Sequence, residues 1–125
     1  MLLIQTYELK LPLEKLIQPA IDLAEQGFSI TEREANLLNN QMQFFDQHNT
    51  NKTVFQKTAP WKQGDILVQK ELAATLKLIQ KEGAKGFYEG KTAELLVAEM
   101  KRGNGIITLN DLKNYKVIER KPLAF

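Results

Sequence analysis

The sequence predicts a mainly α fold: a single helical domain over residues 1–125, with about five to six helices and at most a short β ribbon. Three observations support this prediction. Apolar residues recur at helical spacing in several segments, two segments begin with a capping-box pattern, and glycines follow the apolar stripes. At 125 residues and 43% hydrophobic content, the chain has enough apolar side chain for one modest core.

The first expected helices occupy the N-terminal part of the chain. Residues 2–9 have the character of a helix end, and Pro12 suits the first turn of the next helix, where its missing N–H costs no hydrogen bond. Gly27 is placed to end that helix in a left-handed conformation. Pro19 lies inside it and removes one hydrogen bond, at a cost of about 3 kcal/mol. We therefore expect a kink at Pro19 or a new helix that begins there.

Five further helices are expected, and two of them begin at a recognisable cap. Thr31 and Glu34 form the Thr-x-x-Glu pattern of a capping box, and Thr108 with Asp111 has the same form. Glycines or polar clusters end the intervening helices. The expected ranges are 31–47, 70–81, 84–89, 92–102 and 108–115.

Residues 52–68 are expected to form a loop with short extended pieces. Val54-Phe55 and Ile66-Leu67-Val68 are its β-prone parts, and a ribbon made by them is the β structure that we expect. Trp61 in this loop has two open interpretations. It closes a small satellite core beside Val54 and Phe55, or it is an exposed contact point for the remainder of a larger protein.

Composition excludes several classes of function. There are 17 basic and 15 acidic residues, and the resulting net charge of +2 favours neither a nucleic-acid partner nor an anionic membrane. The absence of cysteine excludes disulfides and thiolate metal sites. No apolar run approaches the roughly 20 residues that span a bilayer.

No group of side chains predicts catalysis. The only serine, Ser29, is expected to be a helix cap or turn residue, and the only histidine, His48, a solvated surface residue. His48 near Asp46 supplies too few ligands for zinc. Carboxylates such as Glu94 and Glu99 alternate with basic residues and indicate solvated helix charge. We assign no catalytic, substrate-binding, cofactor-binding or metal residue, and no cofactor.

Four blocks of sequence carry a resemblance to a known enzyme family. They are LPLEKLIQPAIDLAEQGF at 11–28, KQGDILVQ at 62–69, GFYEG at 86–90 and GIITLNDLKNY at 105–115. In the same order, they resemble segments of the large subunit of gamma-glutamyltranspeptidases. The resemblance implies a peripheral, mostly helical part of an N-terminal-nucleophile hydrolase, packed beside its stacked αββα sheets.

The resemblance also implies what the parent enzyme does. In this family the N-terminal threonine of a separate small subunit attacks the gamma-glutamyl bond of glutathione and passes the glutamyl group to water, an amino acid or a peptide. No threonine of this chain has the family's Thr-Thr-His context, and no arginine matches its substrate-binding segment. The chain alone is therefore expected to be inactive, with the rest of the large subunit and the small subunit as partners. By resemblance, the parent is expected to be periplasmic or secreted.

Two alternatives remain open at this point. The chain is a free-standing helical interaction module derived from such an enzyme, or it is part of a related gamma-glutamyl amidohydrolase or acylase. Residues 116–123 resemble the run into a central strand of the enzyme, which suggests an excised piece or a gene fragment. We also expect self-association through the apolar ends, Leu2, Leu3 and Ile4 with Pro122 to Phe125.

Overall fold

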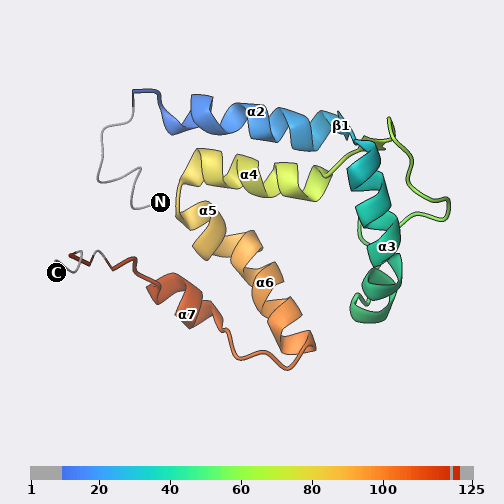
Figure 1. The fold of residues 1–125 in the computed structure, drawn as a ribbon. Helices are drawn as coiled ribbons and strands as arrows, with labels where there is room; N and C mark the ends of the chain where they lie inside the picture. The colour runs from blue at the N-terminus through green and yellow to red at the C-terminus, as the bar shows by residue number, and fades with distance from the viewer. Residues whose placement is uncertain (1–9, 119, 122–125) are drawn as a thin grey trace. The chain divides into compact units, whose positions relative to one another are not determined.

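The computed structural model describes residues 10–118, 120 and 121. The chain divides into two compact units: Met1–Ile17 with Thr75–Phe125, here the terminal unit, and Gln18–Ala74, here the central unit. The described residues contain six α-helices and one two-stranded sheet (Figure 1), so the mainly α prediction with one short ribbon is confirmed. The helix end expected at residues 2–9 and the apolar chain ends lie outside the described residues.

The first described helix, α2 (Leu13–Gln26), contains Pro19 without interruption. The expectation of a new helix beginning at Pro19 is therefore wrong. A proline removes only its own hydrogen bond, and Ile21 and Ala24, both buried, stabilise the turns that follow it. Gly27 ends the helix as predicted, with φ +85° and its N–H donating to the Leu23 carbonyl at 2.9 Å.

The sheet of the central unit joins β1 (Phe28–Ser29) to β2 (Ile66–Leu67) in antiparallel pairing. Phe28 lies opposite Leu67 in this register. The prediction that Val54-Phe55 forms one side of the ribbon is wrong, because those two residues form a turn. The β-prone piece at 66–67 was located correctly, but its partner is the short segment directly after α2.

Helix α3 (Glu32–His48) begins at the predicted capping box. The Glu34 N–H donates to Thr31 Oγ1 at 3.3 Å, and Glu34 Oε2 accepts from the Thr31 N–H at 2.7 Å. This start places Ile30 before the helix and Ala35 in its first turns, both almost fully buried. The core cluster consists of Ile30, Ala35, Trp61 and Leu67, with Phe28, Leu38, Met42 and Phe55 packed against it.

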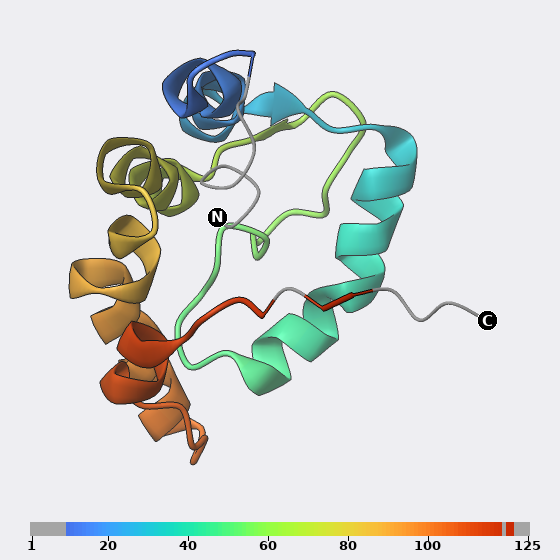
Figure 2. The ribbon, with the colours of Figure 1, turned by 90° about the vertical axis from the view of Figure 1, so that its left-hand side faces the viewer.

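Residues 49–65 connect α3 to β2 without a helix or a strand (Figure 2). The end of this loop is tied to the chain beside β1 by two backbone hydrogen bonds. The Ile30 N–H donates to the Asp65 carbonyl at 2.9 Å, and the Gly64 N–H donates to the Ile30 carbonyl at 3.0 Å. The long loop therefore returns to the core that α3 covers.

The terminal unit contains three helices after α4 (Lys70–Glu82), which begins in the central unit. They are α5 (Lys85–Tyr88), α6 (Gly90–Arg102) and α7 (Leu109–Asn114). α6 contacts both α5 and α7, and the Tyr88 and Tyr115 rings stack with centroids 5.5 Å apart. This stack holds the C-terminal end of α7 against the last residue of α5.

Candidate functional site

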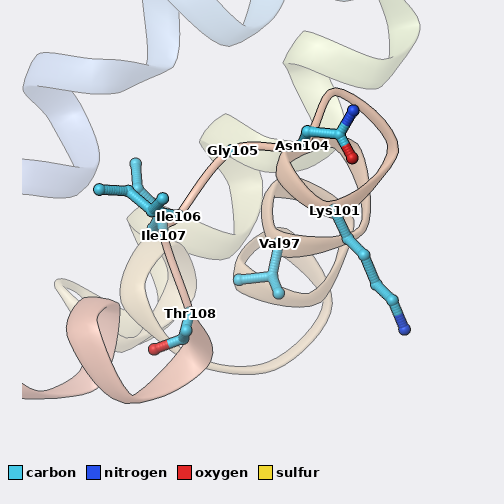
Figure 3. Close-up of a pocket in the computed structure, with 7 residues that line it drawn as sticks. All are labelled: Val97, Lys101, Asn104, Gly105, Ile106, Ile107 and Thr108. Carbon is cyan, nitrogen blue, oxygen red and sulfur yellow. The ribbon is translucent and has the colours of Figure 1, made fainter.

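A pocket of about 450 Å³ opens at the junction of α6 and α7, within the terminal unit (Figure 3). All of its lining residues come from the last turns of α6 or from the connection that leads into α7. They are Val97, Lys101, Asn104, Gly105, Ile106, Ile107 and Thr108. Three of these side chains are apolar and one is charged, a mixture typical of a binding surface.

The turn after α6 has a fixed conformation. Gly103 caps the helix, and Asn104 follows with φ +55°, a left-handed conformation that asparagine tolerates better than most residues. The Gly105 N–H then donates to the Met100 carbonyl at 2.6 Å. A Cβ on Gly105 would lie 2.8 Å from Met100 Sδ and 3.2 Å from the Met100 carbonyl oxygen, so a larger residue would have to displace the methionine side chain.

The start of α7 is fixed by a second capping box. The Thr108 N–H donates to Asp111 Oδ2 at 2.8 Å, and the Asp111 N–H donates to Thr108 Oγ1 at 3.2 Å. The Thr108 hydroxyl also donates to Asp111 Oδ2 at 2.6 Å. Hydrogen bonds from the Thr108 side chain and then from its backbone lower the pKa of Asp111.

Between these two fixed turns the chain is exposed. Every residue from Lys101 to Asp111 is exposed, Ile106 to 90% and Ile107 to 40%. A partner that fully buried the Ile106 side chain would gain about 1.5–3 kcal/mol from its removal from water. The connection thus presents an apolar side chain between two hydrogen-bonded turns.

The pocket is suited to binding and not to acid–base chemistry. The Asp111 carboxylate is occupied by its capping hydrogen bonds, and its lowered pKa makes it a weak base. The Thr108 hydroxyl donates to that same carboxylate, which the helix cap already occupies. Lys101 forms no ion pair with any described residue, so its charge is available to a ligand.

Trp61, for which two interpretations were open, belongs to the core of the central unit. Its side chain is 7% exposed, and its indole Nε1–H donates to the Phe55 carbonyl at 2.8 Å. Lys57 Nζ lies 4.2 Å from the centroid of the ring, a cation–π contact. The interpretation of Trp61 as the lid of a small core beside Phe55 is confirmed, whereas Val54 is 42% exposed.

Polar side chains fasten the loop that carries Trp61. Asn39 on α3 donates through Nδ2 to the Trp61 carbonyl at 3.0 Å and accepts from the Trp61 N–H at 2.8 Å. Asp65 pairs with Lys57 and accepts from the Lys62 N–H at 2.8 Å. The Lys57 hydrogen bond and then that of Lys62 lower the pKa of Asp65. These groups are used for structure.

The other residues considered in the sequence analysis do not line the pocket. Ser29 is an exposed residue of β1, so its expected role as a helix cap or turn residue is wrong, because Thr31 supplies the cap. His48 is the exposed last residue of α3, with its ring 4.3 Å from that of Phe44. Glu99 pairs with Arg102, which lowers the pKa of Glu99.

Two features are absent from the part of the chain that the structure describes. Within residues 10–118, 120 and 121, no three His, Asp or Glu side chains gather as ligands for a metal ion. Among the same residues, no helix has both the length and the apolar character needed to cross a bilayer.

The pocket was not predicted from the sequence. The expectation that glycines or polar clusters end the intervening helices is confirmed at α6, where Gly103 is the C-cap and Asn104 follows with positive φ. A signal for the site was nevertheless present. Ile106 and Ile107 are adjacent β-branched apolar residues between a glycine turn and a capping box, outside the apolar stripe of either neighbouring helix.

Comparison with known proteins finds one family throughout. A family profile described as Gamma-glutamyltranspeptidase matches residues 3–125. The glutathione hydrolase proenzyme of Pseudomonas sp. strain A14 is 43% identical over 112 residues, which are 88% of this chain and 20% of that protein. The capsule biosynthesis protein CapD proenzyme of Bacillus anthracis is 40% identical over 121 residues, and the match covers 90% of this chain and 20% of that protein.

A solved structure extends this similarity to the fold. The crystal structure of Helicobacter pylori gamma-glutamyltranspeptidase matches with a TM-score of 0.86 and 43% identity, and the match covers 97% of this chain and 35% of that chain. This chain spans about a fifth of the length of the two curated relatives.

Proposed function

Because this chain belongs to the gamma-glutamyltranspeptidase family, we propose that it is a structural segment of an enzyme acting on gamma-glutamyl compounds. In this proposal the parent transfers the gamma-glutamyl group of glutathione to water, an amino acid or a peptide through an N-terminal threonine outside this chain. The chain alone is inactive, and its partners are the rest of the large subunit and the small catalytic subunit. The observation that carries the proposal is the match to nearly the whole of this chain but only 35% of the matched chain of the solved structure.

The use of polar groups in the described residues supports a structural role. Glu34 and Asp111 close capping boxes, and Asp65 fastens a loop. The pKa of each carboxyl is lowered by the hydrogen bonds that it accepts. A general acid at neutral pH would instead need a raised carboxyl pKa.

The variety of relatives supports the view that the residues that select the substrate lie elsewhere in the parent enzyme. This one segment is similar to proteins named glutathione hydrolase and capsule biosynthesis protein, at 43% and 40% identity. This chain is about equally similar to both, so the segment does not distinguish the two kinds of relative. The similarity to a protein with a different name keeps a related gamma-glutamyl amidohydrolase or acylase as the alternative parent.

A segment exchange tests the proposal. Residues 10–121 of this chain would replace the aligned segment of the Helicobacter pylori enzyme. We expect the chimera to mature into two subunits and to hydrolyse a chromogenic gamma-glutamyl anilide with a KM within about threefold of the parent value. This chain alone should give no turnover.

Three outcomes would contradict the proposal. Turnover by this chain alone would show that it carries chemistry of its own. A KM changed by more than about tenfold, with maturation intact, would show that the segment contributes to substrate binding. A chimera that fails to mature, together with a stable monomeric chain, would favour the free-standing interaction module.

A further inference from the structure

We propose that the α6–α7 pocket is a docking site for another segment of the parent enzyme, one that carries an apolar side chain next to a carboxylate. This inference rests on the proposed function, since it requires that the chain works inside a larger protein. It adds to that function the place of contact and the chemistry of the contacting segment.

The apolar part of the docking site is ready before a partner arrives. Ile106 is 90% exposed and Ile107 40% exposed, and both line the pocket with Val97. The turn before them is held by the Gly105 N–H to Met100 carbonyl hydrogen bond, and the capping box at Thr108 holds the residues after them. Little conformational freedom is lost when such a support binds, and preorganised contacts of this kind give high affinity.

The charged part of the pocket selects the partner. Lys101 is the one charged side chain among the described lining residues, and it has no ion pair with any described residue. Nearby, Glu99 is neutralised by Arg102, and the Asp111 carboxylate is used in the α7 cap. The pocket therefore presents a positive charge, and a carboxylate on the partner is its complement.

The arrangement of the two parts sets the geometry of the ligand. Figure 3 shows Ile106 and Ile107 on one side of Val97 and the Lys101 side chain extending on the other. A ligand that covers Val97 would place an apolar group toward the isoleucines and a carboxylate toward the lysine. Adjacent side chains of one peptide segment can satisfy both contacts.

The source of the segment follows from the length of the family enzymes. The matched region is 35% of the solved Helicobacter pylori chain, so most of that enzyme lies outside the part aligned here. A second copy of this chain is the other possible occupant. Its net charge of +2 gives no general attraction to Lys101, so the remainder of the parent is the occupant that we propose.

The test measures binding of the full chain to short overlapping peptides that tile the Helicobacter pylori enzyme outside the aligned region. Biolayer interferometry would compare the wild type with Ile106→Ser, Lys101→Glu and the matched control Ile118→Ser, whose isoleucine is 73% exposed outside the pocket. We expect binding by peptides that pair an apolar residue with Asp or Glu. Ile106→Ser should weaken it by about tenfold or more, and Ile118→Ser should leave it within about twofold.

A charge exchange makes the test specific to Lys101. Lys101→Glu should weaken binding of the same peptides, and replacement of the peptide carboxylate by lysine should restore binding to that variant. Circular dichroism would verify that each variant keeps the wild-type helix content. Restoration would support the proposed contact between Lys101 and the carboxylate.

Several results would overturn the docking site. One is the absence of binding below about 1 mM for every peptide. Another is an equal loss of peptide binding for Ile106→Ser and Ile118→Ser. A third is self-association of the chain that Ile106→Ser abolishes, because a second copy would then be the occupant. The segment exchange separates the two proposals. An active chimera with no peptide binding overturns only the docking site, whereas a chimera that fails to mature, together with a stable monomeric chain, overturns the proposed function.

Discussion

Helices α3 and α7 start with the same reciprocal capping box, but the surroundings of the two helices differ. α3 has 17 residues, contributes the buried Ala35 to the core and bonds through Asn39 to the Trp61 backbone. α7 has six residues, none of them buried, and follows a fully exposed connection. Local hydrogen bonds therefore decide where a helix begins, whereas burial against other segments decides how firmly it is held.

This comparison gives the two regions different expected roles. The residues around Trp61 pack against one another in a buried core, and hydrogen bonds hold the loop that carries Trp61. The residues from Lys101 to Asp111 are ordered by caps and leave their apolar side chains in water. A helix of six residues is marginal by itself, so α7 and its connection are the place where a partner would add most stability.

The largest expected effect comes from emptying the packed region. Trp61→Ala should lower the free energy of unfolding by about 3–5 kcal/mol, because it leaves a cavity in the core of the central unit. Ile106→Ala, the control in the exposed region, should change it by less than about 0.5 kcal/mol. Urea unfolding followed by far-UV circular dichroism gives both values. Equal losses of unfolding free energy for the two variants would show that the packed and the exposed regions contribute equally to stability.

A smaller effect is expected from the hydrogen bonds that connect α3 to the loop. Asn39→Ala should cost about 1–3 kcal/mol, because it leaves the part-buried N–H and carbonyl of Trp61 without partners. Asn40→Ala, one position along the same helix and exposed, should cost less than about 0.5 kcal/mol. The same urea experiment measures both variants, and a similar cost for the two would argue against a specific role for Asn39.

Two glycines at the end of α6 should respond with opposite signs. Gly105→Ala should destabilise the terminal unit by about 1–2 kcal/mol, because the new Cβ would lie 2.8 Å from Met100 Sδ and 3.2 Å from the Met100 carbonyl. Gly103→Ala meets nothing closer than 3.6 Å and has φ −90°, so it should stabilise by a few tenths of a kcal/mol. Thermal unfolding measures the two shifts, and equal signs would contradict the close approach at Gly105.

The smallest effect concerns the two caps themselves. Hydrogen bonds lower the pKa of Glu34 below its ordinary 4.5 and the pKa of Asp111 below its ordinary 3.8. The pKa of each carboxyl is lower in the folded protein than in the unfolded chain. Its contribution to stability is therefore complete at pH values above the ordinary pKa, and it is lost as the pH falls through the lowered pKa. Thr108→Val should raise the pKa of Asp111 and leave that of Glu34 unchanged. Carboxyl-carbon NMR titration measures both, and an Asp111 pKa of 3.8 in the wild type would exclude the effect.

Most of the helices could be predicted because their signals are local. A capping box is made within four residues, so Thr31 and Thr108 marked the starts of α3 and α7 correctly. Gly27 likewise ended α2 where expected. At Pro19 the alternative of a new helix was wrong, because the local cost of proline is visible in the sequence, whereas the burial of the residues after it is not.

The rest of the fold depends on partners that are distant in sequence. β-propensity located Ile66-Leu67 but could not identify its partner, which lies almost 40 residues earlier at Phe28-Ser29. The reciprocal bonds of Asn39 join it to a residue 22 positions away, and no pattern within α3 announces them. Neither feature could be read from spacing or propensity alone.

The candidate site could be predicted only in part for the same reason. The turn at Gly103 to Gly105 and the cap at Thr108 follow from residue type. The exposure of Ile106 does not, because burial depends on which other segments pack there. Periodicity analysis also ignores residues between helices, where both isoleucines lie.

Trp61 is the only tryptophan of the chain, and it lies in the core of the central unit with the Lys57 ammonium over its ring. The indole emission of the unmodified protein therefore reports on that unit alone. Ellipticity comes from the helices of both units. If the emission and ellipticity curves separate during denaturation, the chain does not unfold in one step, and the emission curve follows the unfolding of the central unit without any added label.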